Sequence, residues 1–288
     1  MREQPRELVC RSYRLSAGAR TLVMGILNVT PDSFYDGGNF FSRDKAIERV
    51  HAMAREGADI IDIGGQSTRP GAERVSAEEE MDRVMPVVDA VAREIGIPVS
   101  VDTFYAAVAS EALRKGASII NDITGLRGDP GMAGTIASYN ACAIIMHMKG
   151  TPKDMQDDPL YGDVVSEVKG FLSESVRMAE NAGIAPDSIV IDPGIGFGKT
   201  FEHNVILLSR LAELKALGKY VMVGVSRKSF IGHITGRQAG DRLTGTAAAC
   251  ACAVMNGAGI IRVHDVKEMR GAAGVADAIT RSWEGGVR

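Results

Sequence analysis

The sequence is poor in cysteine, has no strong excess of either charge and contains no long hydrophobic run. Its four cysteines, Cys10, Cys142, Cys250 and Cys252, form no CxxC pair and no His/Cys cluster with zinc-ligand spacing. Cys250 and Cys252 lie two residues apart in a run that indicates a helix, so we expect them on different faces. We interpret the cysteines as small hydrophobic residues of a reduced, cytoplasmic protein.

The net charge of −3 gives no global basic field, so we expect no nucleic-acid partner. The amino-terminal residues MREQPRELVC lack the apolar core of a signal peptide. The longest stretch of small apolar residues, 247–255, is too short to span a bilayer. We therefore expect a soluble protein with no membrane partner.

The composition that remains is ordinary for a globular protein, with 45% hydrophobic and 24% charged residues in a chain of 288. This length suits one large α/β barrel or two small domains. Short apolar runs rich in β-branched residues recur eight times, a pattern typical of parallel strands covered on both faces. We expect strands at residues 21–28, 59–64, 99–103, 119–123, 143–148, 189–194, 220–226 and 260–265.

Helical patterns separate most of these runs. Ser76 and Glu79 form a capping-box signature, and the apolar stripe that follows is interrupted by Pro86, which we expect to kink the helix. The stretch from Val205 to Lys215 indicates another helix. Eight strand–helix units favour a closed TIM (β/α)8 barrel over an open sheet, as a single domain over residues 1–288.

Polar residues end every predicted strand. One Asp at a strand end is more often a helix cap than a ligand. Eight consecutive polar ends instead favour a convergent pocket at the carboxyl end of a barrel. The residues are Asn28, Asp62, Asp102, Asn121 with Asp122, His147, Asp192, Ser226 with Arg227 and Lys228, and Arg262 with His264.

The glycine-rich segment PGIGFGKT, residues 193–200, does not match a nucleotide-binding loop. Pro193 occupies the first glycine position of the phosphate-loop pattern, and Lys199 occupies the last glycine position of the dinucleotide pattern. We interpret the segment as a turn after the sixth strand, whose glycines allow a ligand to approach closely.

Lys228 has three interpretations. A lysine in a barrel mouth can form a Schiff base, and the neighbouring Arg227 would lower its pKa. It can also donate a hydrogen bond to a ligand carbonyl or ring nitrogen. We favour this binding role over imine chemistry and over a solvated surface position.

Arg262 and His264 alternate on the last strand, so both side chains point inward or toward the mouth. An arginine fork beside a histidine suits a pyrophosphate. The alternative is an internal ion pair of Arg262 with Asp62 or Asp265. Outside the strands, we interpret three histidines as surface or capping residues: His51, His203 and His233.

Two loops, 28–38 and 67–73, are long or rich in glycine and combine charged with aromatic or polar residues. Their chemistry favours lids over ordinary connections.

Together these motifs resemble the dihydropteroate synthase family. The matching segments run from Met24 to Val266: MGILNVTPDSFYDGG, IIDIGGQSTRPGA, VSVDT, IINDITG, MHMKGTPKDMQ, IDPGIGFGKT, VGVSRKSFIG, GTAAA and IRVHDV. The resemblance implies a TIM barrel that transfers the 7,8-dihydropterin-6-ylmethyl group from 6-hydroxymethyl-7,8-dihydropterin diphosphate to 4-aminobenzoate. The products would be 7,8-dihydropteroate and diphosphate, in folate biosynthesis.

The resemblance also implies roles for individual residues. Hydrogen bonds to the pterin edge are expected from Asp102, Asn121, Asp192 and Lys228, and apolar walls from Met146 and Phe197. The diphosphate would lie against Arg262 and His264, and Asn28 would ligate Mg²⁺ that the diphosphate carries. The aminobenzoate subsite would be shaped by Thr68, Arg69, Pro70, Ser229 and Phe34.

The implied reaction breaks a C–O bond to diphosphate and needs no protein nucleophile. Arg262, His264 and Mg²⁺ would stabilise the leaving charge, and Lys228 completes the catalytic group. Asp192 is expected to accept two N–H bonds from the pterin at the exposed mouth. The alternative is that Asp192 caps the turn before Gly194.

Two residues depart from the family in the predicted lid loops: Gln66, where Glu is common, and Tyr35, where Ser is common. We expect a homodimer, from the family and from the small residues of 246–255. The alternative functions are a methyltetrahydrofolate–corrinoid methyltransferase, a non-catalytic pterin-binding paralogue and, more distantly, a Schiff-base aldolase.

Overall fold

Eight parallel strands close into a barrel in the order β10-β3-β4-β5-β6-β7-β8-β9. The computed structural model describes residues 7–16, 20–30, 43–67, 71–157 and 159–285. The barrel strands are β3 (Leu22–Asn28), β4 (Ile60–Gly64), β5 (Val99–Asp102), β6 (Ile119–Asp122), β7 (Cys142–Met146), β8 (Ile189–Asp192), β9 (Tyr220–Val223) and β10 (Ile260–Val263). The predicted TIM barrel is confirmed, and several strands end two or three residues earlier than predicted.

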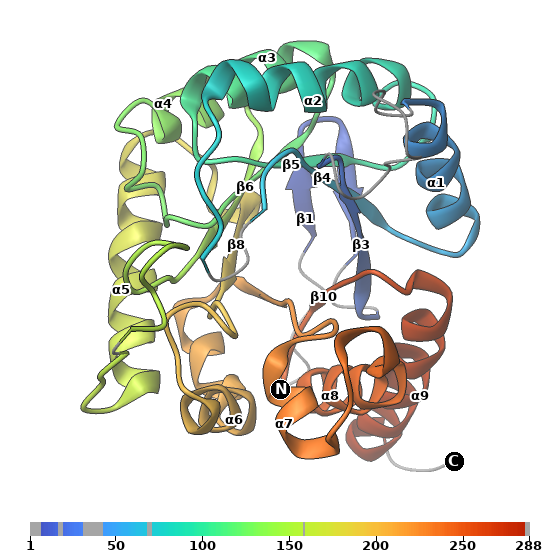
Figure 1. Ribbon diagram of the computed structural model, residues 1–288, viewed down its shortest axis with the longest axis vertical. Coiled ribbons are helices and arrows are strands. Elements are labelled where there is room, and N and C mark those ends of the chain that lie inside the picture. Colours follow the sequence, from blue (N-terminus) through green and yellow to red (C-terminus); the bar gives the residue numbers. More distant parts are fainter. Residues whose placement is uncertain (1–6, 17–19, 31–42, 68–70, 158, 286–288) are drawn as a thin grey trace.

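The helices form a ring around the strands (Figure 1). They are α1 (Arg43–Arg55), α2 (Ala77–Val91), α3 (Ala106–Lys115), α4 (Met132–Ser138), α5 (Val164–Asn181), α6 (Phe201–Ser209), α7 (Ser229–Thr235), α8 (Leu243–Met255) and α9 (Val266–Gly285). Short 3₁₀ helices cover Pro186–Ser188, Leu211–Leu217 and Ala239–Asp241. No described helix combines the length and apolar character that a membrane span requires.

Helix α2 begins as its sequence predicts, because the Ser76 hydroxyl accepts the Glu79 N–H at 3.1 Å. The helix continues through Pro86 to Val91.

The helix predicted across residues 205–215 is instead divided in two. Helix α6 ends at Ser209, and a 3₁₀ helix begins at Leu211. Arg210 between them has φ −105° and ψ 19°, outside the α-helical range. Its guanidinium binds Asp163 and Glu213, which stabilises the break.

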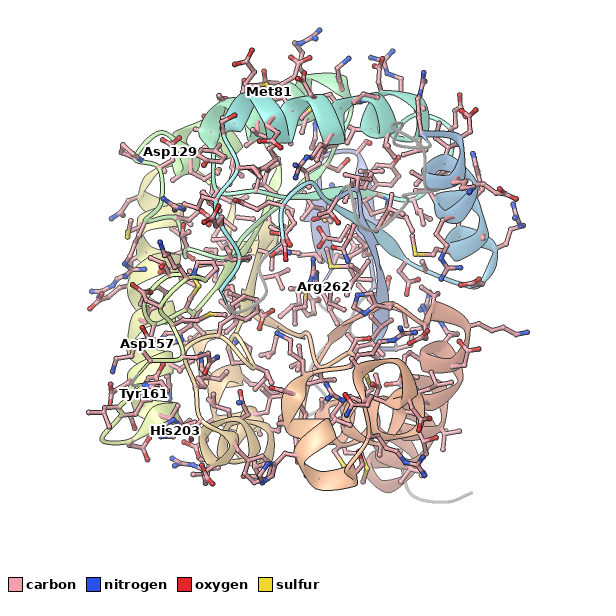
Figure 2. The ribbon with its side chains drawn as sticks, viewed as in Figure 1. Met81, Asp129, Asp157, Tyr161, His203 and Arg262 are labelled. Carbon is pink, nitrogen blue, oxygen red and sulfur yellow. The ribbon has the colours of Figure 1, made fainter. Side chains whose placement is uncertain are left out.

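The main hydrophobic core lies between the strands and the surrounding helices. Side chains also fill the centre of the barrel (Figure 2). At its amino-terminal end this filling includes Leu22, Ile60, Ile119, Cys142 and Ile260, which are the first residues of five barrel strands. The interior is therefore a packed layer beneath the mouth and not a channel.

A hairpin that the sequence analysis did not predict closes this end of the barrel. Strands β1 (Leu8–Cys10) and β2 (Tyr13–Leu15) pair in antiparallel fashion, and Leu8 and Cys10 are buried in the interior layer. At the hairpin turn, Arg11 donates to the carbonyls of Leu113 and Ala117, both at 2.9 Å. The hairpin is thus a plug at the end opposite the mouth.

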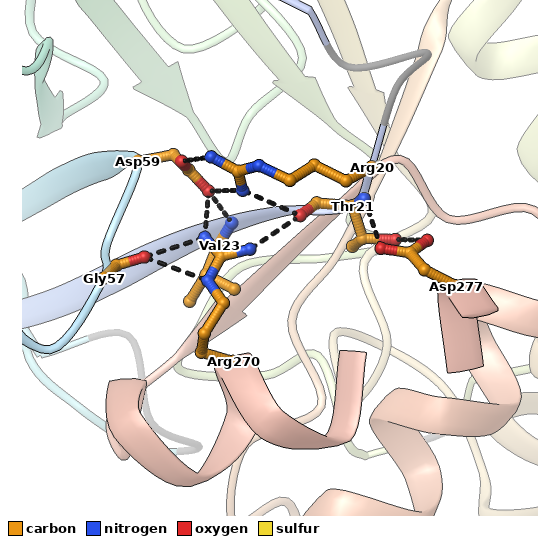
Figure 3. A network of polar contacts seen from close by, with 7 residues as sticks. All are labelled: Arg20, Thr21, Val23, Gly57, Asp59, Arg270 and Asp277. Atoms are coloured by element: carbon orange, nitrogen blue, oxygen red, sulfur yellow. Dashed lines mark hydrogen bonds and ion pairs between the residues drawn. The ribbon is translucent and has the colours of Figure 1, made fainter. Parts of the chain in front are cut away.

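A polar network at the same end joins the last helix to the first barrel strand (Figure 3). Asp59 binds Arg20 at 2.5 Å and also Arg270 of α9. Asp277 of α9 accepts the N–H and the hydroxyl of Thr21, both at 2.8 Å. Burial opposes ionisation of Asp59, but the hydrogen bond from Arg20 and the charge of Arg270 hold its pKa below the ordinary value. The network therefore ties α9 to the start of β3 and to the residues that precede β4.

All four cysteine thiols are free, and three of them are buried. Cys250 is buried and Cys252 is exposed, which confirms that they lie on different faces of α8.

Candidate active site

Arg262 lies at the centre of the barrel mouth (Figure 2). Its Nε donates to Asp62 Oδ2 at 2.6 Å, and its Nη2 donates to Asp102 Oδ2 at 2.8 Å. Asn121 Nδ2 donates to the same Asp62 oxygen at 3.2 Å. Four strands therefore contribute to one network, and the ion pair that the sequence left open for Arg262 is formed with Asp62 and not with Asp265.

Two carboxylates share this one guanidinium. Burial raises the pKa of Asp102; Arg262 opposes the shift, and the negative charge of Asp62 adds to it. Three buried oxygens of the same region, Asp62 Oδ1, Ser100 Oγ and Asn121 Oδ1, have no hydrogen-bond partner among the described residues. Buried acceptors of this kind are normally satisfied by water or a ligand, so the network is prepared to bind N–H donors.

Asp192, the last residue of β8, is buried and not exposed at the mouth as predicted. Its Oδ1 accepts the Gly194 N–H at 2.7 Å, so one oxygen caps the turn as the alternative interpretation held. Burial raises the pKa of Asp192, against the Gly194 N–H and the charges of Lys228 and Arg262. Oδ2 takes no part in this hydrogen bond.

Lys228 immediately precedes α7, and its Nζ donates to the Ile195 carbonyl at 2.6 Å. The ammonium also lies 4.1 Å from the ring centroid of Phe197. Burial lowers the pKa of Lys228 to about 8, with Asp192 opposing the shift. The predicted cause, Arg227, is wrong, because that guanidinium is paired with Asp265.

An apolar wall borders the polar network. Met146 packs with Phe104 and Ile123, and Phe197 lies against this cluster. The turn after β8 approaches closely: a Cβ on Gly194, which has φ 67°, would lie 1.9 Å from the His147 carbonyl oxygen. Only glycine fits there, because the turn packs directly against the backbone that follows β7. The predicted close approach of a ligand to these glycines stays a prediction.

His264 follows β10, two residues after Arg262. Its Nδ1 is 2.9 Å from Ser226 Oγ, which also accepts the His264 backbone N–H at 3.2 Å. Asn28 ends β3, the strand that pairs directly with β10. A Cβ on Gly64 would lie 3.9 Å from Asn28 Oδ1 and 3.8 Å from Asp102 Oδ2. Both oxygens therefore lie close to Gly64, whose missing side chain leaves space between them.

His147 and Asp122 do not join the pocket that their strand ends predicted. Each follows a mouth residue, Met146 or Asn121, and successive strand residues face opposite sides. Asp122 accepts the N–H groups of Thr124 and Leu126 and so stabilises a turn.

His147 instead binds Lys199, whose role the sequence analysis missed. Lys199 Nζ lies 2.8 Å from His147 Nδ1 and donates to the Phe197 carbonyl at 2.9 Å. Burial lowers the pKa of Lys199 well below its ordinary value and lowers that of His147 to about 2. This pair positions the loop that carries Phe197.

Several predicted residues lie outside the described part of the chain: Phe34, Tyr35, Thr68, Arg69 and Pro70. Ser229 is the exposed first residue of α7, directly after Lys228. Gln66 is described, and its Oε1 accepts the Val75 N–H at 3.0 Å, which joins the two ends of the second predicted lid loop. His203 caps α6 through Thr200, as predicted for a histidine away from the mouth.

Comparison with known proteins identifies the family of this chain. Residues 24–264 match the family model of pterin binding enzymes. A dihydropteroate synthase of Synechocystis is 49% identical over 265 residues, which is 92% of each chain. The chain belongs to the dihydropteroate synthase family.

Solved structures of the dihydropteroate synthases agree with this assignment. The Yersinia pestis enzyme, solved with a sulfonamide drug, is 44% identical and superimposes with a TM-score of 0.90 over 96% of this chain and 99% of that one. The Xanthomonas albilineans enzyme, solved with 4-aminobenzoic acid, is 44% identical, with a TM-score of 0.89 over 96% and 98%. Both the resemblance and the fold that the sequence predicted are confirmed.

Proposed function

We propose that the barrel mouth binds 6-hydroxymethyl-7,8-dihydropterin diphosphate and 4-aminobenzoate and joins them into 7,8-dihydropteroate with release of diphosphate. The observation that carries this proposal is the network of Asp62, Asp102 and Asn121 around Arg262, beside an apolar wall. Carboxylate and amide oxygens next to apolar side chains suit a planar heterocycle whose edge carries adjacent N–H donors.

The pterin ring would lie between this network and Met146 and Phe197. Asp192 Oδ2, Asp102 and Asn121 would accept its N–H groups. Because the Ile195 carbonyl already holds one Lys228 hydrogen, the ammonium has a defined orientation and can donate to the ring carbonyl or a ring nitrogen.

The diphosphate would lie against Arg262 and His264. The Nη1 atom of Arg262 takes part in neither carboxylate bond, so it can donate to the leaving group. The C–O bond to diphosphate breaks and its electron pair leaves with the diphosphate. The amine nitrogen then forms a C–N bond to the methylene carbon and loses a proton. Asp102 and Asp192 favour the positive charge that develops on the ring, and the cations favour the leaving group.

The residues of the mouth fit Mg²⁺ that arrives on the substrate. Among the described residues, no group of three or more His, Cys, Asp or Glu side chains could hold a metal ion. Mg²⁺ commonly binds through substrate phosphates and one or two protein oxygens. Asn28 Oδ1, beside Asp102, is such an oxygen. When bound, the metal supplies charge neutralisation of the leaving diphosphate.

The 4-aminobenzoate subsite would be formed by residues of the two predicted lid loops and by Ser229. The residues are Thr68, Arg69, Pro70, Phe34 and Ser229. The Xanthomonas enzyme was solved with 4-aminobenzoic acid and the Yersinia enzyme with a sulfonamide, which has the shape of the arylamine; both support 4-aminobenzoate as the second substrate.

A cytoplasmic homodimer is the form proposed for the protein. Helix α8 presents Thr244, Ala248, Cys252 and Met255 at helical spacing, and all four are exposed. The small side chains of Thr244, Ala248 and Cys252 allow close approach of a second helix, and the exposed Met255 adds apolar surface.

One assay tests the function. The protein is incubated with dihydropterin diphosphate, 4-aminobenzoate and Mg²⁺, and dihydropteroate and diphosphate should form in equal amounts. Binding without turnover would favour the paralogue, and methyl transfer from methyltetrahydrofolate to a corrinoid would favour the methyltransferase. Borohydride trapping of a carbonyl compound on Lys228 would favour the aldolase. When Arg262 is substituted in this assay, the matched control is Arg237→Ala, which removes an exposed arginine.

A further inference from the structure

Arg227, the residue before Lys228, has a backbone conformation that is unfavourable for a residue with a side chain. Arg227 has φ 58°, in the left-handed region where a Cβ crowds the neighbouring carbonyl oxygen. Such a residue persists where its surroundings hold it in place, and these residues gather at functional sites. The turn between β9 and α7 therefore depends on the contacts of Arg227.

Three sets of contacts hold Arg227. Its N–H donates to Thr246 Oγ1 of α8 at 3.1 Å, and its carbonyl accepts from Arg242 Nη1 at 2.9 Å. Its guanidinium binds Asp265 through Nη2 at 2.6 Å and through Nε at 3.1 Å. A two-point ion pair of this kind restricts orientation as well as distance.

The ion pair joins the ends of two neighbouring strands. Asp265 directly follows His264, and Ser226 directly precedes Arg227. Ser226 Oγ lies 2.9 Å from His264 Nδ1, so two consecutive residues after β9 are bonded to two consecutive residues after β10. Lys228 is the next residue after Arg227, and His264 is itself one of the four bonded residues.

We propose that the Arg227–Asp265 ion pair is a positioning device for Lys228 and His264. It holds Arg227 in the left-handed conformation, which directs Lys228 toward Ile195 and Phe197. It also fixes Lys228 relative to His264. Neither Arg227 nor Asp265 touches the substrate in this role. The inference rests on the proposed function, because Lys228 and His264 are taken as ligands of the pterin and its diphosphate.

The first test is Asp265→Asn, which keeps the shape of the side chain and removes its charge. Affinity for dihydropterin diphosphate, measured by calorimetry, should fall about tenfold to a hundredfold, since small displacements of binding groups have effects of that size. If Asp265 merely neutralised Arg227, its loss would leave an extra positive charge near the diphosphate and tighten binding. Unchanged or tighter binding overturns the proposal. Asp241→Asn is the matched control, because it removes the exposed Arg237–Asp241 ion pair.

The second test separates backbone from charge. Arg227→Gly and Arg227→Ala remove the same ion pair, but only glycine adopts a positive φ freely. The glycine variant should therefore retain more affinity than the alanine variant, and both should melt as folded proteins. Equal losses of affinity would show that the ion pair does not serve the backbone conformation.

A double-mutant cycle with Lys228→Ala completes the test. If Asp265 acts through the position of Lys228, Asp265→Asn should lower affinity much less in the Lys228→Ala background than in the parent. Fully additive losses would contradict the proposal. A parent protein that does not bind dihydropterin diphosphate would remove the proposed function and this inference together. A parent that binds, with an Asp265→Asn variant that binds equally well, removes the inference alone.

Discussion

Arg262 Nε donates to Asp62 Oδ2 at 2.6 Å, and Asp62 is completely buried beneath it. The guanidinium assigned to the leaving group therefore also neutralises the interior of the barrel. Removing one member of a buried ion pair leaves an uncompensated charge, which costs about 3–5 kcal/mol. A substitution of Arg262 must for this reason affect both the ligand and the protein.

Arg262→Ala should weaken binding of dihydropterin diphosphate far more than binding of free 6-hydroxymethyl-7,8-dihydropterin. A hydrogen bond to a charged group contributes roughly 1.5–3 kcal/mol, or about tenfold to a hundredfold in affinity. The melting temperature should fall as well, because Asp62 and Asp102 lose their shared cation. Calorimetry with both ligands checks the first point, and equal weakening would mean that Arg262 mainly stacks on the ring. Arg237→Ala should change neither quantity.

Asp192→Asn should abolish most pterin affinity and leave folding nearly intact. The Asn Oδ1 can still accept the Gly194 N–H, while its amide places a donor against a donor of the pterin edge. The lost bond and the unpaired donors together should cost on the order of 3 kcal/mol in binding. Calorimetry measures the role of Asp192 in pterin binding, and thermal melting measures its role in stabilising the turn at Gly194. Near-normal affinity with a lowered melting temperature would show that Asp192 serves only the turn.

Glu80→Gln should make the protein more stable at neutral and alkaline pH. Glu80 of α2 is completely buried, and burial raises its pKa from 4.5 to about 7, with Thr103 and Arg83 offsetting only part of the shift. Between these values the folded state keeps a proton that the unfolded chain has released, so stability falls as the pH rises. The full penalty is about 3 kcal/mol, at roughly 1.4 kcal/mol per pKa unit.

Denaturant titrations of both proteins from pH 5 to pH 8 measure this effect. The free energy of unfolding of Glu80→Gln minus that of the parent should grow across that range. A difference that stays constant would mean that Glu80 ionises normally. Glu78→Gln, an exposed position two residues before Glu80, provides the control.

Sulfonamides should inhibit competitively against 4-aminobenzoate, and excess EDTA should suppress activity. A sulfonamide copies the arylamine, so Pro70, Phe34 and Ser229 should treat the two alike. Initial rates at several aminobenzoate concentrations decide the first point, and restored activity on adding Mg²⁺ decides the second. Inhibition that does not depend on aminobenzoate concentration would contradict the subsite.

A thiol reagent should label one cysteine of the native chain and four after denaturation. Cys252 is exposed, and the other three thiols are buried. If α8 forms the dimer interface, Cys252 should react more slowly as the protein concentration rises. Ala248→Arg should restore fast labelling and yield a monomer by light scattering. Fast labelling at every concentration would place any interface elsewhere, and Cys252→Ser should lose the native signal.

Hydrophobic runs and polar strand ends were enough to predict the barrel and most of its mouth. Asp62, Asp102 and Asn121 do converge, because parallel strands end at one face. The same pattern included His147 wrongly, since it marks where strands end but not which side each residue faces. Alternation from Met146 would have placed His147 on the opposite side.

Two features were missed for different reasons. The hairpin strands Leu8–Cys10 and Tyr13–Leu15 are three residues each, and their Arg-Ser turn lacks the Asn-Gly or Asp-Gly signal of a tight hairpin. The only sequence signal at Lys199 is that it interrupts a glycine motif. Lysines are almost never fully buried, so composition alone predicts an exposed side chain there.

The network of Arg20, Asp59 and Arg270 has a consequence for synthesis on the ribosome. Arg270 and Asp277 belong to α9, which follows all eight barrel strands, while Thr21 and Asp59 lie at the starts of β3 and β4. Until β10 and α9 emerge, one side of β3 is an open strand edge, which can pair with other nascent chains. Barrel closure must therefore wait until β10 has been synthesised, because β10 pairs with both β3 and β9.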